Sequence, residues 1–426
     1  MSKLFDKAII YSMAGLTRNT AQDVASALAE DLTPSEVMSF DPDAVSNALN
    51  SLGMPLRNGD HAVNVAVALN KVLSTKPAAD PGEGQWRSFG FTQPIPVDPD
   101  VYGDDPAMAV GIAGVGAVLM CVEIRERVLP SASINDVLIE RVAAFEEKEG
   151  RHAVKKDIAM LKDEVTARML KTAPIRRKRV PVLLAHGLCV MFTTSYKLSD
   201  DIGALLRKLF GTWPVTPIFT DSLQPGMHGL IYETKLPLHE MSDDELEEQR
   251  FYPGENAKLR DRDDDAVITI KDETLTQEGS TAQLLVDRAI SVEEMTLTFY
   301  PRGALGDCAN DRINLKVHKS GVLKKFELAG LTAADLDGVM DRMAGTEGPQ
   351  DNELSLRPMA SLFIITKALK TLLDEMIKAG AMLPEYAGYG FLPPDDFDLD
   401  PGVEGSVANR ISKSQDDEEW EDDDEL

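Results

Sequence analysis

Residues 131–180 read SASINDVLIERVAAFEEKEGRHAVKKDIAMLKDEVTARMLKTAPIRRKRV and contain two helix-forming segments separated by one glycine. Ser133 or Asn135 can cap a first helix, and Gly150 ends it after Glu149. A second helix is expected over residues 152–171. Apolar side chains recur on one side of each segment, which predicts a helical hairpin with a charged outer face that projects as an arm. These side chains are Leu138, Ile139, Val142, Ala143 and Phe145 on the first helix, and Ile158, Leu161, Val165 and Met169 on the second.

The segments on either side of this hairpin alternate between strand and helix patterns, so we expect an α+β fold. A chain of 426 residues exceeds one typical core. We therefore expect an N-terminal α+β part in residues 1–130, the helical arm in 131–180, a second α+β part in 181–392 and a disordered tail in 393–426. The expected strands cover residues 7–13, 115–124, 180–184, 188–193, 266–270, 294–300, 313–317 and 323–328, and the expected helices cover residues 20–32, 60–73, 199–210, 333–344 and 358–379.

Two connections have turn-forming sequences. Residues 77–106 are dense in Pro, Gly and Asp and are expected to be irregular, with Trp86, Phe89 and Phe91 attaching them to the core. Ser320-Gly321 separates the last two expected strands, which predicts a hairpin.

Charge is distributed unevenly along the chain. The formal net charge is −27, which by itself argues against a partner that carries phosphate. Residues 151–180, however, contain ten Lys/Arg against three Asp/Glu, and residues 395–426 contain 14 Asp/Glu against two basic residues. The sequence therefore predicts a basic segment within an acidic body, followed by an acidic tail.

Several classes of site are disfavoured by the sequence. Cys121, Cys189 and Cys308 lie far apart without CxxC spacing, which is typical of free thiols in a reducing cytoplasm and argues against a structural metal. The six histidines have no HxH or HExxH spacing. The glycines in 111–116 lack the Gly-Lys-Ser/Thr ending of a phosphate loop and indicate tight backbone packing. We expect no cofactor and no metal.

No segment predicts export or membrane insertion. The N-terminus lacks a long apolar run before a small-residue cleavage site. The longest apolar run, residues 107–122, is interrupted by glycines and is shorter than the ~20 residues that span a bilayer. We expect a buried strand there, a cytoplasmic protein and no membrane partner.

Six runs, in the same order along the chain, resemble the RdgC family of recombination-associated DNA-binding proteins. The resemblance covers about residues 4–380, whereas residues 33–76 look expanded and the acidic tail looks additional. The runs are Phe5-Asp6-Lys7-Ala8-Ile9-Ile10-Tyr11, Phe89-Gly90-Phe91 with Pro94 and Pro96, Val128-Leu129-Pro130-Ser131, Leu161-Lys162-Asp163-Glu164-Val165, residues 206–217 (LRKLFGTWPVTP) and Gly321-Val322-Leu323-Lys324-Lys325-Phe326.

This resemblance implies a horseshoe-shaped protomer of several subdomains with a projecting two-helix finger. Two protomers would pair as a homodimer and close a ring around DNA. The family binds single- and double-stranded DNA with little sequence preference, associates with the nucleoid and restrains RecA-type recombinases by occupying their DNA. The older label of the family, putative exonuclease, brings no catalytic residues that can be transferred to this chain.

The sequence departs from the family at three positions. Lys271-Asp272-Glu273 stands where relatives have a Lys-Lys-Gln run, so only Lys271 carries over. A family lysine aligns with Glu294. The phenylalanine at the finger tip aligns with Pro174.

Backbone phosphates require repeated cations and no particular bases, so the basic runs are the candidate DNA contacts. The alternative is a solvated face, or one already paired with the many carboxylates of the chain. The candidates are Lys155, Lys156, Lys171, Arg176, Arg177, Lys178 and Arg179 in the arm, and Lys271, Lys324 and Lys325 beyond it; Lys316 and Lys319 belong to the same second basic group.

Two other function classes stay open. Acidic residues at 242–245 and 263–265 are conceivable ligands for the divalent metal of a nuclease. The acidic composition also permits a DNA mimic that binds a basic protein. Residues 416–426 can compete internally with DNA, can recruit a recombinase or another protein, or can simply keep the chain soluble. Our main expectation is a non-enzymatic protein that works by occupying DNA, with no catalytic residues.

Overall fold

We describe the fold from a computed structural model of the chain. It describes residues 5–12, 61–96, 106–112, 115, 117–185, 188–210, 213, 215–218, 223–233, 251–261, 265–276, 280–282, 291–301, 312–329, 336–340 and 353–379. The chain divides into two units, Met1–Phe391 and Leu392–Leu426. The second unit, the expected helix over residues 20–32 and most of the expected helix over 333–344 lie outside the described residues.

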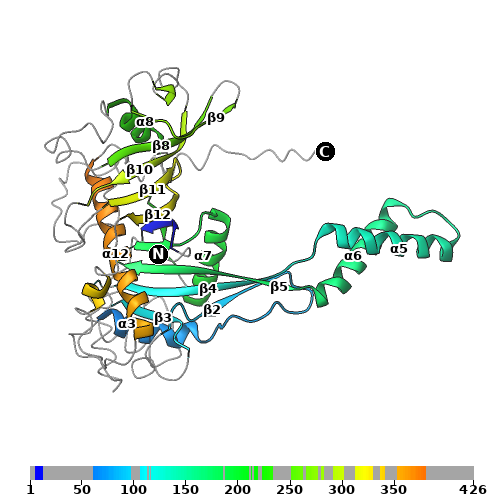
Figure 1. Cartoon of the computed structure of the whole chain (residues 1–426). Helices are drawn as coiled ribbons and strands as arrows, with labels where there is room; N and C mark the ends of the chain where they lie inside the picture. The colour runs from blue at the N-terminus through cyan, green and yellow to red at the C-terminus, as the bar shows by residue number, and fades with distance from the viewer. Residues whose placement is uncertain are drawn as a thin grey trace, which may run out of the picture. The chain divides into compact units, whose positions relative to one another are not determined.

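One antiparallel sheet of twelve strands runs through the described part of the first unit (Figure 1). Ten strands follow the order β2-β4-β5-β6-β1-β12-β11-β10-β8-β9, while β3 pairs with β4 and β7 with β1. All strand pairs are antiparallel. The strands are β1 (Lys7–Ser12), β2 (Arg87–Thr92), β3 (Ala109–Ile112), β4 (Ala117–Arg127), β5 (Ile175–Ala185), β6 (Leu188–Met191), β7 (Thr216–Pro217), β8 (Phe251–Arg260), β9 (Val267–Ile270), β10 (Ser291–Phe299), β11 (Arg312–His318) and β12 (Leu323–Ala329).

Alternation of side chains along the strands separates two apolar cores. On one face, Leu183 and Val190 join residues of helices α8 (Gln224–Glu233) and α12 (Glu353–Ala379). On the other face, Val182 and Met191 join residues of α3 (His61–Leu73) and α7 (Tyr196–Phe210). Because successive residues of a strand point to opposite faces, a sheet covered on both faces must be apolar at nearly every position. The buried stretch Val180–Ala185 has this composition.

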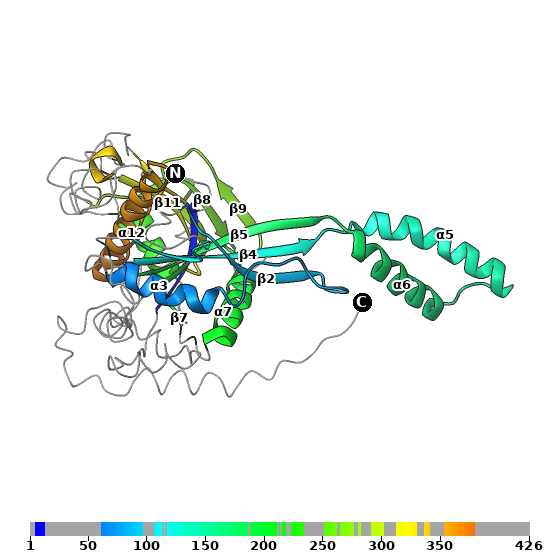
Figure 2. The same ribbon diagram turned by 90° about the horizontal axis from the view of Figure 1, so that it is seen from below.

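The predicted helical hairpin is confirmed. Helices α5 (Ser131–Glu149) and α6 (Lys155–Thr172) lie at the ends of β4 and β5 (Figures 1 and 2). Gly150 ends α5 in the left-handed conformation, at φ 63°. Arg127 on β4 donates to the carbonyls of Leu170 and Lys171 at 2.9 and 3.1 Å, which satisfies the last turn of α6 and joins the hairpin to the strands.

Details of the hairpin differ from the prediction. Helix α5 begins at Ser131, directly after Pro130, and has no side-chain cap, so neither Ser133 nor Asn135 is the cap. Ile139, Ala143 and Ile158 of the predicted apolar stripes are exposed, with Ile139 retaining 69% of its accessible surface. Two helices alone bury only the residues along their contact line, which here include Ile134, Leu161 and Val165.

Other predicted elements are confirmed with shifted bounds, and three were missed. The helices at α3 and α7 and the β11–β12 hairpin are present, and Gly321 occupies its turn at φ 78°. The apolar run expected as one strand is instead the hairpin of β3 and β4. Strand β2 crosses the segment expected to be irregular, and Trp86 is 46% exposed and does not attach it to the core. Strand β8 and helix α8 had no counterpart in the prediction.

The expected tight packing around the glycines of residues 111–116 is confirmed at Gly111, on β3. A Cβ atom at this position would lie 2.4 Å from the backbone nitrogen of Val63 and 2.5 Å from the carbonyl of Ala62, both on α3. Only glycine allows this approach of helix and strand. Cys121 and Cys189 are buried free thiols, and burial raises the pKa of both.

Candidate nucleic-acid interface

The four basic residues Arg176–Arg179 lie on strand β5 and all four are exposed. Along β5, Arg176 is paired in register with Glu126 of β4, and Arg179 is paired with Glu123. Because side chains alternate across a strand, Arg176 and Lys178 point to the face that carries α7, and Arg177 and Arg179 point to the opposite face. The sequence treats the run as one cluster, and the structure divides it between two surfaces.

On the face that carries α7, cations from four strands follow one another. Lys7 of β1 lies directly opposite Lys324 of β12, and Lys324 lies opposite Lys316 of β11. The charges of Lys7 and Arg176 both act on Lys178. We call these five residues, Arg176, Lys178, Lys7, Lys324 and Lys316, the basic strip.

One end of the basic strip is partly neutralised. Glu126 accepts from Arg176 at 2.8 Å and from Arg87 of β2 at 3.1 Å, and both contacts lower the pKa of its carboxyl group. Arg176 remains 69% exposed. An ion pair this open to water contributes little, on the order of 0.2–1 kcal/mol, so a phosphate can replace Glu126 as its partner.

The middle of the strip has a surplus of positive charge. Partial burial lowers the pKa of the Lys178 ammonium, and repulsion by Lys7 and Arg176 lowers it further. Among the described residues, neither Lys7 nor Lys178 forms an ion pair with a carboxylate. An anion placed here would relieve repulsion that the folded chain otherwise retains.

On the opposite face, one arginine is paired with two carboxylates and another with a carbonyl oxygen. Arg125 binds Asp80 and Glu123, each at 2.7 Å. Arg179 donates to the main-chain carbonyl of Gln93. The two predicted contacts on this face, Arg177 and Arg179, form no ion pair within the described part of the chain.

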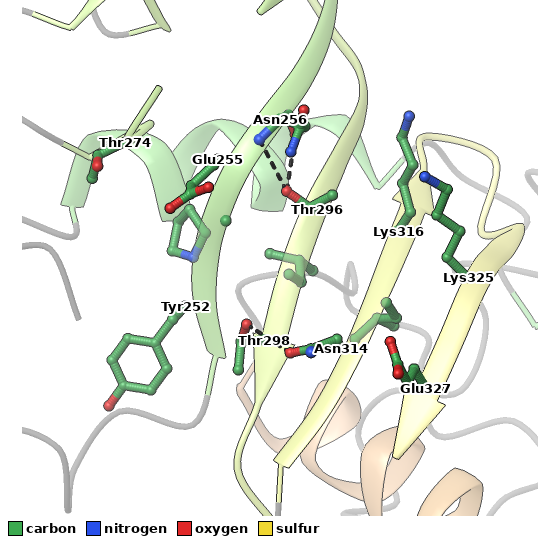
Figure 3. Close-up of a pocket in the computed structure, with 14 residues that line it drawn as sticks. Tyr252, Glu255, Asn256, Thr274, Thr296, Thr298, Asn314, Lys316, Lys325 and Glu327 are labelled. Carbon is green, nitrogen blue, oxygen red and sulfur yellow. Dashed lines mark hydrogen bonds between the residues drawn. The ribbon is translucent and has the colours of Figure 1, made fainter. Parts of the chain in front are cut away.

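A groove of about 410 Å³ lies beside the strip, over strands β8, β10, β11 and β12. Lys316 and Lys325 stand at its edge with their ammonium groups on the same side of the sheet (Figure 3). Its floor carries Thr298, which donates to Asn314 at 3.2 Å. The groove is further lined by Tyr252, Pro253, Gly254, Glu255, Asn256, Thr274, Thr296, Leu297, Leu315 and Glu327.

A β-bulge aims Lys325 at this groove. Asn314 pairs with Glu327 and Lys316 with Lys324, so Lys325 and Phe326 together oppose the single residue Leu315. Lys325 has a φ of 51°, which few residues other than glycine adopt. Bulges redirect side chains, and here the irregularity brings Lys325 to the same face as Lys324.

The remaining predicted contacts are dispersed. Lys155 and Lys156 are exposed in the first turn of α6, and the 18 residues of that helix separate them from β5 by roughly 27 Å. Lys171, in the last turn of α6, binds Glu83 at 2.7 Å. Lys271 is exposed just after β9. The structure therefore does not join the ten predicted residues into one surface.

Two cations of this region were not predicted. Lys7 occupies the first position of a strand-like apolar run, and Arg87 follows Trp86 in a segment expected to be irregular. The sequence feature that could have identified Lys7 is its position in the first run that resembles the family. Nothing in the local sequence of Arg87 indicates its position beside Glu126.

The described residues contain no group of three His, Cys, Asp or Glu side chains arranged to hold a metal. The acidic residues 242–245 and 263–264, considered above as nuclease ligands, lie outside the described residues. None of the helices in the described ranges is both long and apolar enough to cross a membrane.

A family model described as "Putative exonuclease, RdgC" matches residues 58–381 of the chain. The chain belongs to the RdgC family. It is similar to the recombination-associated protein RdgC of Pseudomonas entomophila, with 26% identity over 323 residues that cover 75% of this chain and 93% of that protein. It is also similar to RdgC of Pseudomonas putida KT2440, at 26% over 304 residues covering 70% of the chain and 87% of that protein. A shorter match to RdgC of Pseudomonas paraeruginosa has 31% identity over 155 residues, or 36% of the chain and 48% of that protein.

RdgC relatives are named for their association with recombination, which agrees with the resemblance found in the sequence. The matched range includes β2 to β12 but begins after β1, so it contains the whole basic strip except Lys7. This chain is therefore a member of a recombination-associated family. Most of its candidate DNA-binding residues lie within the range that the family model matches.

Proposed function

We propose that this protein binds the phosphate backbone of single- and double-stranded DNA without reading sequence, and so limits the loading of RecA-type recombinases. The observation that carries the proposal is the surplus of positive charge around Lys7, which is half-buried, and Lys178, which is exposed. Phosphates are the anions that repeated, unpatterned cations hold. The name shared by the relatives supports recombination as the setting.

The cations of the basic strip are arranged to contact the DNA backbone and not the edges of the bases. Its cations come from β5 and from the neighbouring strands β1, β12 and β11, with β6 alone between β5 and β1, and the charge of Lys7 reaches Lys178 across that gap. The strip contains two lysines without an ion-pair partner in the described part of the chain and one arginine in a weak pair. Such a strip neutralises successive phosphates and carries no sequence information.

We propose further that the protein acts as a homodimer, with the α5–α6 hairpin as the finger that reaches a second copy. Exposed apolar side chains on the hairpin support this: Ile139 at 69%, Val154 at 57% and Met160 at 56% of their accessible surface. Apolar side chains gathered on an exposed element are typical of interaction surfaces. A dimer that closes around DNA would dissociate slowly, because opening an interface must precede release. In this proposal the protein needs no chemistry and no cofactor: it excludes a recombinase by occupying the strand.

Binding is tested with the purified full-length chain and fluorescent 30-mers of single- and double-stranded DNA, by anisotropy over a salt series. The proposal expects similar dissociation constants for unrelated sequences and a steep linear fall of log K with log salt. A recombinase-filament assay on the same DNA should show inhibition that follows the fraction of DNA occupied. Absence of binding at low salt would overturn the proposal.

Two outcomes would favour the rivals. Degradation of end-labelled DNA in Mg²⁺ or Mn²⁺ would support the exonuclease of the family description. A comparison of the full chain with a version that ends at Leu392 tests the acidic tail. Stronger binding after truncation supports a tail that competes with DNA, whereas no binding by either version supports an acidic DNA mimic.

A further inference from the structure

Glu294 of β10 lies at the groove end of the basic strip and holds two of its lysines. Its Oε1 atom accepts from Lys316 Nζ at 2.5 Å, and its Oε2 atom accepts from Lys324 Nζ. Each carboxylate oxygen thus engages one ammonium. Two oxygens of a backbone phosphate would engage the same two lysines in the same way.

The ion pairs of Glu294 are stronger than the Arg176–Glu126 pair at the other end of the basic strip. The Glu294 side chain is only 9% exposed, and Lys316 and Lys324 are 25% and 35% exposed. Burial alone would raise the pKa of Glu294, but Lys316 and Lys324 outweigh it and hold the pKa below its usual value. Glu294 is therefore ionised at neutral pH. Because water screens this pair less than it screens Arg176 and Glu126, DNA displaces it less readily.

Lys325 is the neighbouring cation that Glu294 does not hold. The bulge brings it to the edge of the groove beside Lys316 (Figure 3). No carboxylate of the described residues forms an ion pair with it. Three lysines thus face one patch of the sheet, and one resident carboxylate neutralises two of them.

We propose that Lys316, Lys324 and Lys325 form a phosphate-binding site in which Glu294 is a resident competitor of the DNA backbone. This inference rests on the proposed DNA binding and names the residue that limits it. With Glu294 in place, Lys325 alone contributes a free charge at this site. The chain thereby holds DNA less tightly than its lysine count implies.

The test is Glu294→Gln in the full-length chain, measured by anisotropy on a double-stranded 30-mer between 50 and 200 mM salt. Freeing one or two lysines should steepen the slope of log K against log salt by about 1–2, at ~0.9 per phosphate contact. The advantage of the variant over the wild type should accordingly shrink by about 3- to 12-fold across this salt range.

The matched control is Glu293→Gln. Glu293 is adjacent, its side chain is 8% exposed, and it also binds two cations, Lys319 at 2.8 Å and Arg260 at 3.4 Å. Neither of these cations lines the groove. Both variants change the net charge by the same amount, so a gain that is equal in both reflects overall charge and overturns the inference.

A second pair of variants decides the matter if Glu294→Gln fails to fold by thermal unfolding. In the wild-type background, Lys325→Gln should weaken binding about 3-fold or more at 100 mM salt, and Lys324→Gln should weaken it much less because Glu294 already occupies that lysine. Equal losses overturn the inference. No binding by the wild type itself would instead refute the proposed function, which keeps the two failures distinguishable.

Discussion

Lys7 and Lys324 lie directly opposite each other in the antiparallel pairing of β1 with β12. Like charges in this position destabilise a sheet by roughly 0.2–1 kcal/mol relative to neutral pairs. Glu294 compensates Lys324, whereas Lys7 faces the further positive charge of Lys178. The fold thus retains a repulsion that a bound polyanion would remove.

This repulsion predicts opposite effects of Lys7→Gln on stability and binding. Removing the charge should raise the free energy of unfolding by a few tenths of a kcal/mol, up to about 1 kcal/mol. The same change should weaken DNA binding and reduce the salt slope by about 1. Urea unfolding and anisotropy on one preparation measure both. A variant that loses stability together with affinity would show that Lys7 is structural.

The division of the basic run between two faces predicts different effects for neighbouring residues. Lys178→Gln removes a cation from the basic strip, and Arg177→Gln removes one from the opposite face. Both side chains are exposed, so neither change should alter the fold. We expect Lys178→Gln to reduce the salt slope by about 1 and Arg177→Gln to leave it nearly unchanged. Equal reductions would mean that both faces of β5 contact DNA.

The sequence predicts the helical hairpin, α7 and the β11–β12 hairpin because each depends on local periodicity and turn residues. It places the start of β5 five residues too late, because four consecutive cations have no apolar alternation to indicate a strand. Their strand conformation comes from pairing with β4, which is distant in sequence. For the same reason the sequence does not indicate which basic residues share a face.

The ion pairs of Glu294 with Lys316 and Lys324 likewise depend on tertiary structure. Glu294, Lys316 and Lys324 come from three adjacent strands. The sequence alone shows a glutamate at this position, and only the register of β10, β11 and β12 places it between two cations. Local sequence patterns predict helices and strands. Whether a charged side chain is neutralised depends on how the strands pair with one another.

The ion pairs of Glu294 predict how stability depends on pH. The folded-state pKa lies below the usual value of 4.5, so the ionised group stabilises the fold above that pH, and this contribution is lost as pH falls through the folded pKa. The difference in unfolding free energy between the wild type and Glu294→Gln should be largest near neutral pH and should disappear in acid. Urea unfolding between pH 3 and 7 measures it. With Lys316 and Lys324 both changed to Gln, burial alone remains and the pH trend should reverse.

Adding one methyl group at Gly111 should disrupt packing and lower the free energy of unfolding. Gly111→Ala would place Cβ 2.4 Å from the α3 backbone, which cannot move aside as a side chain would. We expect a loss of about 2 kcal/mol or more in unfolding free energy. The control is Gly203→Ala in α7, where no atom lies within 4 Å of the new Cβ and the helix should gain roughly 0.5–1 kcal/mol. Opposite signs in thermal unfolding support the close contact of α3 and β3.

The exposed apolar residues of the hairpin predict where the proposed dimer is weakest. Ile139→Asp should weaken dimerisation by about tenfold or more if Ile139 is central to the contact with a second copy. Val267→Asp on β9 is the control, because Val267 is also exposed, at 47%, but lies outside the hairpin. Sedimentation velocity over a concentration series measures the dimer constant of each.

The same variant separates ring closure from electrostatic attraction. The basic strip is unchanged in Ile139→Asp, so the association rate with DNA should stay close to that of the wild type. Dissociation should become faster, because a protein that no longer closes around DNA can leave without opening an interface. Stopped-flow measurements on a circular single strand, which has no free end, should show the largest increase in dissociation rate. Unchanged dissociation in a variant that is monomeric would mean that the strip alone holds DNA and that the finger serves another contact.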